Sequence, residues 1–242
     1  IIPITFIGNI PIKIVIDEKN RKLTNFDFVA IENAIDALRY SFTFDFAKNE
    51  IHKKYHRDIF FNLVNSQLNY DDTTEAANML NLKEDAYYRV VSFHSIPEDQ
   101  KEKYSLEQLD EVDSIANEIS MFYPKDHIYK NVSQIVMLQK MDSDKEDDDS
   151  RKRLNELIDI VKKSISKRDQ NTNFNVGVGE IVKGYRNLKN SYKQSRIAMK
   201  FIKIARRITG EINKSIVYYS KLGIFQSFIE LDDINKLKKY VP

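Results

Sequence analysis

Hydrophobic and polar positions follow different patterns in the successive parts of the chain. Near the start, two β-branched runs, 4–7 and 12–16, are separated by Gly8 and Asn9. β-Branched runs on either side of a two-residue Gly-Asn turn predict a β-hairpin. Because two strands are not stable by themselves, we expect residues 1–23 to be the end of a larger domain.

A long helical pattern runs from about residue 24 to residue 66 without Gly or Pro. Thr24 or Asn25 can cap this helix, and Asp27 lies in its first turn. At about 100° per residue, its apolar residues form two stripes on nearly opposite faces. The first stripe consists of Phe28, Ile31, Ile35, Leu38 and Phe42. The second stripe consists of Tyr40, Phe44, Ile51, Tyr55 and Ile59. The alternative is two shorter helices with a break at 45–49.

A helix with two apolar faces contacts two different partners. We expect the first stripe to pack on the preceding domain. The second stripe needs another partner, and we predict that it is the interface of a homodimer, because soluble monomers rarely expose an apolar stripe of this length. The competing interpretation is that the downstream domain of the same chain covers the end of the second stripe.

The pattern then alternates between strands and helices. A short capped helix at 71–82 comes first. Strands are predicted at 86–96, at 173–181 and at 215–220, and two more lie within 127–141 around a turn at 130–133. Helices are predicted at 105–123, at 150–168, at 187–206 and, after the strand at 215–220, as far as residue 240. The order from residue 86 is β-α-β-β-α-β-α-β-α, which predicts an α/β (α+β) sandwich with a mixed sheet and flanking helices.

Composition excludes several classes of protein. The chain has no cysteine, so it has neither disulfides nor thiolate metal sites, which favours the cytoplasm. It contains no apolar run of membrane-spanning length, so we expect no membrane partner. Its net charge of +2 is too balanced to imply nucleic-acid binding.

Three of the six glycines, Gly177, Gly179 and Gly184, lie between a predicted strand and a predicted helix, where many proteins bind phosphate. A Walker loop needs Lys and Ser or Thr where Tyr185 and Arg186 stand, and a dinucleotide loop needs glycine at Val182. We therefore predict that the first two glycines allow a close approach of a neighbouring element, and that Gly184 makes the turn before the helix.

Two further patterns are weak candidates for metal binding. The acidic run 142–149 lacks the Gly and Glu that an EF-hand requires, and it is interpreted as a solvated loop. His52 and His56 are spaced for one helix face, but Lys53 stands where a zinc protease has Glu and the surroundings are basic. Lysines and arginines also crowd residues 183–207. They are interpreted as a solvated helix face, with a nucleic-acid stripe as the alternative.

The order of elements, with a hairpin between the second and third strands, is similar to the GGDEF nucleotide-cyclase fold. Within it, residues 176–201 resemble a signature of the GGDEF-like middle domain of PucR/CdaR bacterial transcriptional regulators. The matching residues are Gly177, Val178, Gly179, Leu188, Ser191, Tyr192, Ser195, Arg196 and Ala198, followed later by Tyr219, Leu222 and Gly223. The resemblance covers roughly residues 50–240.

A cyclase of this fold would carry two glycines and two acids at the hairpin, where they make room for nucleotide and bind Mg²⁺. This chain has Lys130-Asn131-Val132-Ser133-Gln134 there, and its first strand offers Phe93 and His94 in place of a metal-binding Asp. Since phosphoryl transfer needs the metal to neutralise charge, the resemblance implies a degenerate domain. We predict that it has no enzymatic activity, metal or cofactor.

The resemblance also implies a division of the chain. We expect the remnant of a GAF-like sensor domain at 1–23, connector helices at 24–84, a GGDEF-like domain at 85–230, and at 231–242 the start of a linker to a helix-turn-helix domain that this chain lacks. The predicted function is that of a regulatory and dimerising fragment of a ligand-responsive transcriptional regulator, with an unknown small-molecule effector and with DNA contacted only through the absent domain. The alternative is a nucleotide-binding receptor or enzyme on a degenerate cyclase fold.

Overall fold

The computed structural model describes residues 2–4, 12–16, 21–65, 68–97, 106–123, 127–130, 134–168, 172–209 and 216–230. The chain forms two compact units, Ile1–Asp58 and Ile59–Pro242.

The first unit contains a small antiparallel sheet. Strand β1 (Ile2–Ile4) pairs with β2 (Ile12–Ile14), and Ile2 lies opposite Ile14. This pairing confirms the predicted hairpin, although β1 precedes most of the run expected at 4–7. The predicted turn at Gly8 and Asn9 lies outside the described residues.

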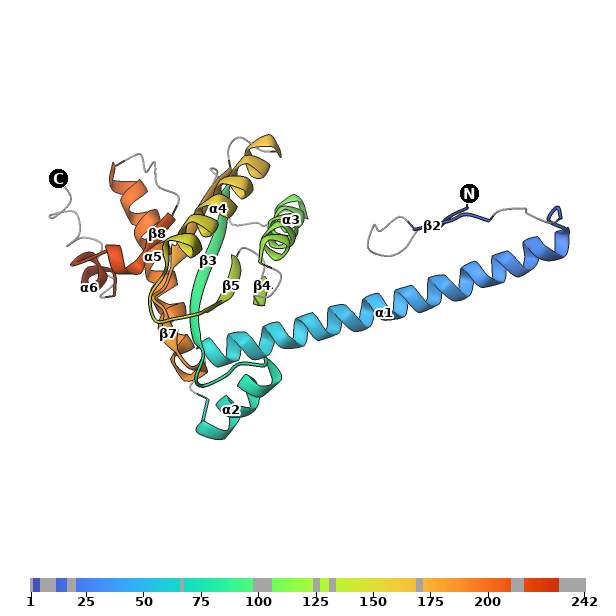
Figure 1. The fold of residues 1–242 in the computed structure, drawn as a ribbon. Helices are drawn as coiled ribbons and strands as arrows, with labels where there is room; N and C mark the ends of the chain where they lie inside the picture. The colour runs from blue at the N-terminus through green and yellow to red at the C-terminus, as the bar shows by residue number, and fades with distance from the viewer. Residues whose placement is uncertain are drawn as a thin grey trace. The chain divides into compact units, whose positions relative to one another are not determined.

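Helix α1 (Asn25–Asn65) is continuous over 41 residues (Figure 1). The single long helix is therefore confirmed, and the alternative with a break at 45–49 is wrong. At 1.5 Å per residue the helix is roughly 60 Å long. Its first turn is held by Asp27, whose carboxylate accepts hydrogen bonds from the backbone N–H and the hydroxyl of Thr24, each at 2.7 Å. The Arg21 guanidinium beside Asp27, together with Thr24, holds the pKa of that carboxyl well below its usual range.

The second unit is built on a six-stranded mixed sheet with the order β4-β5-β3-β6-β8, to which β7 adds by pairing with β3. After α1 the elements are α2 (Tyr70–Met79), β3 (Tyr87–Pro97), α3 (Leu106–Phe122), β4 (His127–Lys130), β5 (Gln134–Met141), α4 (Asp148–Arg168), β6 (Thr172–Val178), β7 (Val182–Lys183), α5 (Leu188–Thr209), β8 (Ile216–Tyr218) and α6 (Phe225–Glu230). Strand β3 is central and runs antiparallel to β5 and β6, whereas β6 and β8 are parallel. Among the described residues the predicted order is confirmed, and only the two-residue β7 and two 3₁₀ turns, Tyr185–Asn187 and Tyr219–Lys221, were not predicted. The predicted continuation of the last helix to residue 240 lies outside the described residues.

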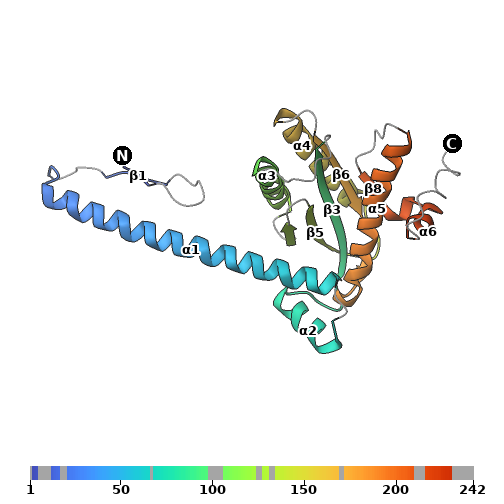
Figure 2. The same ribbon diagram turned by 180° about the vertical axis from the view of Figure 1, so that it is seen from behind.

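Helices α3 and α4 cover one face of this sheet (Figure 2). Alternation along β3 places Val91 and Phe93 on that face, because successive side chains of a strand point to opposite sides. They pack with the apolar faces of the two helices, which include Ile119 and Leu157, and Phe93 also stacks on Phe174 of β6 at 5.9 Å between ring centroids.

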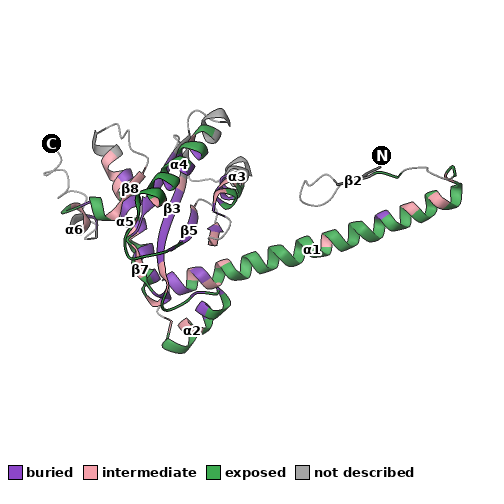
Figure 3. Ribbon diagram, viewed as in Figure 1, coloured by how far each residue is buried: buried purple, intermediate pink, exposed green. Residues whose placement is uncertain are grey.

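The last turns of α1, together with α2 and α5, cover the opposite face. Val90 of β3 points to this side and packs with Phe60 and Leu63 of α1 and with Leu188 of α5. The ring of Phe60 stacks on Tyr129 of β4 with 4.1 Å between centroids and 7° between planes. Figure 3 shows how burial along α1 is concentrated where the helix reaches this core.

Among the described residues, no helix has a stretch long and apolar enough to cross a lipid bilayer.

Candidate functional site

The β4–β5 hairpin is where a cyclase of this fold would bind metal and nucleotide. Lys130 ends β4 and Gln134 begins β5, while 131–133 lie outside the described residues. The ammonium group of Lys130 pairs with the carboxylate of Asp113 on α3. Phe93 is fully buried in the core under α3 and α4. Within the described part of the chain, no three His, Asp or Glu side chains are grouped closely enough to hold a metal ion, and this includes the surroundings of His52 and His56.

The glycines of β6 make room for helix α5. A Cβ built on Gly177 would overlap the backbone oxygen of Ser195 and lie 2.7 Å from Cγ of Met199, and one on Gly179 would overlap the backbone oxygen of Ser191. Gly184 has φ +75°, a conformation that favours glycine, in the turn before α5. The prediction of a close approach and a turn is therefore confirmed.

The serines of α5 complete this contact. The hydroxyl of Ser191 accepts a hydrogen bond from the backbone N–H of Val90 at 2.9 Å and donates one to the backbone oxygen of Glu180 at 2.7 Å. The hydroxyls of Ser195 and Ser92 share a 2.7 Å hydrogen bond, and both residues are fully buried. The glycine and serine positions of the resemblance thus form a packing motif between a helix and a strand.

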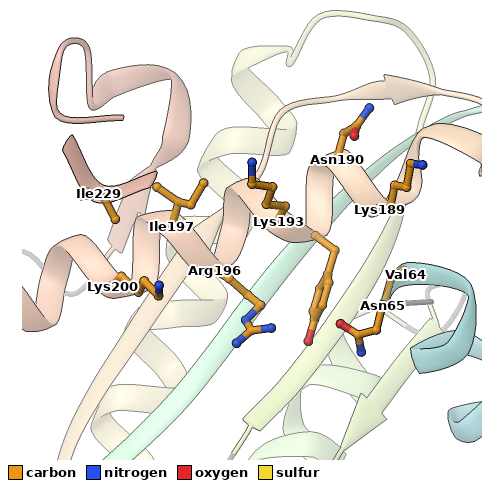
Figure 4. Close-up of a pocket in the computed structure, with 10 residues that line it drawn as sticks. Val64, Asn65, Lys189, Asn190, Lys193, Arg196, Ile197, Lys200 and Ile229 are labelled. Atoms are coloured by element: carbon orange, nitrogen blue, oxygen red, sulfur yellow. The ribbon is translucent and has the colours of Figure 1, made fainter. Parts of the chain in front are cut away.

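A pocket of about 540 Å³ lies along the other side of α5 (Figure 4). Its cationic wall consists of Lys189, Lys193, Arg196 and Lys200. Buried apolar side chains from three helices contribute the rest of the lining: Val64 of α1, Ile197 of α5 and Ile229 of α6, together with the ring of Tyr192. Asn65 and Asn190 add side-chain amides. The pocket therefore combines positive charge with an apolar floor.

Tyr192 connects this pocket to the hairpin strand. Burial raises the pKa of the Tyr192 phenol, against the opposing effects of the Arg196 charge and of hydrogen bonds with Asn65, Arg196 and Gln134. The guanidinium of Arg196 lies 5.8 Å from the centre of the Tyr192 ring. A neutral phenol beside Arg196 can donate a hydrogen bond at physiological pH.

The residues predicted for the dimer interface fall into two groups. Tyr40, Phe44, Ile51 and Tyr55 are all more than half exposed on α1. Ile59 is only partly exposed, because it packs against the core under α1, α2 and α5. The structure thus covers the last residue of the second stripe with its own domain, as the competing interpretation anticipated. In the first stripe, Ile35 is buried.

Sequence reasoning missed a buried ion pair at the end of the sheet. Arg89 of β3 is 2% exposed, and its guanidinium donates to Gln139 at 2.6 and 3.1 Å and pairs with Glu146, which also accepts from Arg151 at 3.0 Å. Glu146 belongs to the acidic run 142–149, so the interpretation of that run as a solvated loop is wrong for this residue. The signal was present: an arginine inside a strongly apolar strand requires a charged partner.

The arrangement of the second unit defines the class of protein. A central antiparallel strand, a β4–β5 hairpin at one edge, a parallel β6–β8 pair and helices on both faces form a mixed α/β domain of the GGDEF-like type. Residues 66–201, more than half of the chain, match the family of the GGDEF-like domain, and the chain belongs to this family. A comparison with curated proteins gave no match.

Proposed function

We propose that this chain is the dimerising regulatory part of a cytoplasmic bacterial transcriptional regulator of the PucR/CdaR type. Its GGDEF-like domain is catalytically silent and acts as a scaffold. DNA is contacted by another domain of the regulator, and an effector changes the arrangement of the dimer.

The observation that carries this proposal is a heptad pattern on the exposed side of α1. Ala37, Tyr40, Phe44, Ala47 and Ile51 follow each other at spacings of three and four residues, and all five are exposed. Apolar residues at such spacings form the seam between two supercoiled helices. The two small alanine side chains of this pattern leave space for a facing helix to approach. We call these five residues the α1 seam.

A second copy of the chain is the partner that suits this seam best. A two-fold interface uses the same surface on both subunits, and a single helix face with one heptad register is self-complementary. Regulators that read two-fold DNA half-sites commonly share that symmetry in their regulatory parts. The resemblance to the PucR/CdaR signature supports the same class.

The end of α1 provides a path from the seam to the domain. Phe60, Leu63 and Val64 are buried against the sheet, and Phe60 stacks on Tyr129 of the hairpin strand β4. A rotation of α1 in the dimer would therefore have to displace these side chains. Because a close-packed core has low compressibility, it would transmit the movement to the sheet. This supports a relay role for the helix.

Sedimentation equilibrium of the chain and of three variants tests the proposal. Phe44→Glu places a like charge at the centre of the α1 seam in both subunits and Ile51→Glu places one at its last position, and we expect folded monomers where the parent chain is a dimer. Asn49→Glu is the matched control, since it adds the same charge on the opposite side of the same turns and should leave the dimer intact. A monomeric parent chain at micromolar concentrations, or equal dissociation by all three substitutions, would refute the α1 seam as the interface.

A further inference from the structure

We propose that the pocket along α5 binds a small phosphorylated organic anion. This inference is independent of the proposed dimer, because the described residues that line the pocket all belong to the second unit.

The charge of the pocket comes from one side of one helix. Lys189, Lys193, Arg196 and Lys200 stand at positions i, i+4, i+7 and i+11, so they are neighbours along the same face of α5. Like charges at this spacing destabilise a helix. None of the described residues that line the pocket is acidic. A bound polyanion would contact several of these cations at once, because they lie along one face of the helix.

The shape of the pocket distinguishes it from an ordinary basic surface. Its volume of about 540 Å³ falls within the range of small-molecule sites. Val64, Ile197 and Ile229 are buried apolar side chains that nonetheless line it. A ligand that contacts both the floor and the cations must have an apolar portion and a strongly charged portion. An extended nucleic-acid backbone would use the cations and leave this floor unused.

The donor set favours phosphate over a single carboxylate. The planar guanidinium of Arg196 matches phosphate oxygens in a bidentate arrangement, and three lysines supply further point charges around it. The side-chain amides of Asn65 and Asn190 can orient a neighbouring polar group of the ligand. Because Asn65 is the last residue of α1, such a ligand would tie the end of this helix to α5.

Isothermal titration of the whole chain at about 150 mM salt, where exposed charges are largely screened, tests the inference with ADP, pyrophosphate and adenosine, all without magnesium. We expect ADP to saturate one site per chain, pyrophosphate to bind more weakly because it lacks an apolar portion, and adenosine to bind at least about tenfold more weakly than ADP. The double variant Lys193→Ala/Arg196→Ala should lose about tenfold or more in ADP affinity. Lys152→Ala, which removes an exposed lysine from α4, should bind as the parent does.

Circular dichroism of each variant establishes that it is folded before titration. The inference is overturned if ADP fails to saturate at millimolar concentration, if adenosine binds as tightly as ADP, or if the double variant binds as Lys152→Ala does. It is also overturned if a short DNA duplex binds more tightly than ADP at the same salt and depends on the same two cations, because the surface would then be a nucleic-acid contact. None of these outcomes bears on the proposed dimer, which the sedimentation of the chain and its α1 variants tests separately.

Discussion

Gly177 of β6 lies directly beneath the backbone oxygen of Ser195 on α5, so closely that a Cβ on this glycine would overlap that oxygen. The atom that such a Cβ would overlap belongs to the main chain of α5, and a helix backbone cannot move aside as a flexible side chain can. The position of α5 on the sheet therefore depends on a residue that has no side chain.

Replacing Gly177 with Ala should destabilise the second unit by about 3 kcal/mol or more, because overpacking a tight core commonly costs 1–3 kcal/mol even where side chains can adjust. Denaturant unfolding measures the change. Gly223→Ala is the control: this glycine has φ +53° and nothing within 4 Å of the added Cβ, so it should cost only about 1–2 kcal/mol, the backbone penalty of a left-handed conformation. Equal costs at the two positions would contradict the close packing of α5.

Removing Glu146 should be far more costly than removing an exposed acid. Glu146→Ala leaves the guanidinium of Arg89 buried with its charge uncompensated, and such a loss typically costs about 3–5 kcal/mol. Asp113→Ala breaks the pair with Lys130, in which both side chains are more than 40% exposed, and should cost no more than about 1 kcal/mol. The same unfolding measurement compares the two, and a Glu146→Ala variant as stable as Asp113→Ala would refute the buried pair.

Stability should fall at alkaline pH, in part through Tyr129. Burial against Phe60 and His127 raises the pKa of the Tyr129 phenol. The contribution of the neutral Tyr129 phenol to the free energy of unfolding is complete below the ordinary tyrosine pKa of about 10. It is lost as the pH rises above that value, because the unfolded chain then releases a proton that the folded chain retains. Tyr129→Phe should stay within about 1 kcal/mol of the parent at pH 7 and lose less free energy of unfolding between pH 9 and about 11.

Tyr70→Phe is the matched control for this pH series. Tyr70 is 70% exposed, and phenylalanine preserves the ring over which Arg186 lies at 3.7 Å. Its alkaline profile should run parallel to that of the parent. If Tyr129→Phe and the parent lose stability at the same rate, the hydroxyl of Tyr129 is not buried in the folded chain.

Purified protein should show no turnover of GTP or ATP with Mg²⁺. At the hairpin, Lys130 is paired with Asp113, and on strand β3 Phe93 is packed against Phe174. A paired lysine and a buried phenylalanine therefore stand where a cyclase of this fold would carry its metal ligands. Chromatographic analysis of the nucleotides after prolonged incubation measures this directly. Product formation above a no-protein blank would contradict the proposal of a silent domain.

Much of the architecture could be predicted from the sequence because it depends on local periodicity. The 3.6-residue pattern of α1, without Gly or Pro, predicted one continuous helix, and the structure excluded the alternative break at 45–49. The strand and helix order from Tyr87 onward followed from alternating and helical spacing. The role of Gly177 and Gly179 was also predictable, since their neighbours failed to match any phosphate-binding loop.

Tertiary structure decided which charged residues matter. The sequence shows the lysines and arginines of α5 as one face of a helix, and it cannot show that Val64 of α1 and Ile229 of α6 close a pocket beside them. Likewise, Arg89 and Glu146 are 57 residues apart, and nothing local connects them. Periodicity is a property of neighbouring residues, so it determines which face of each element is apolar. Pockets and buried ion pairs form between elements, so they depend on which faces the folded chain brings together.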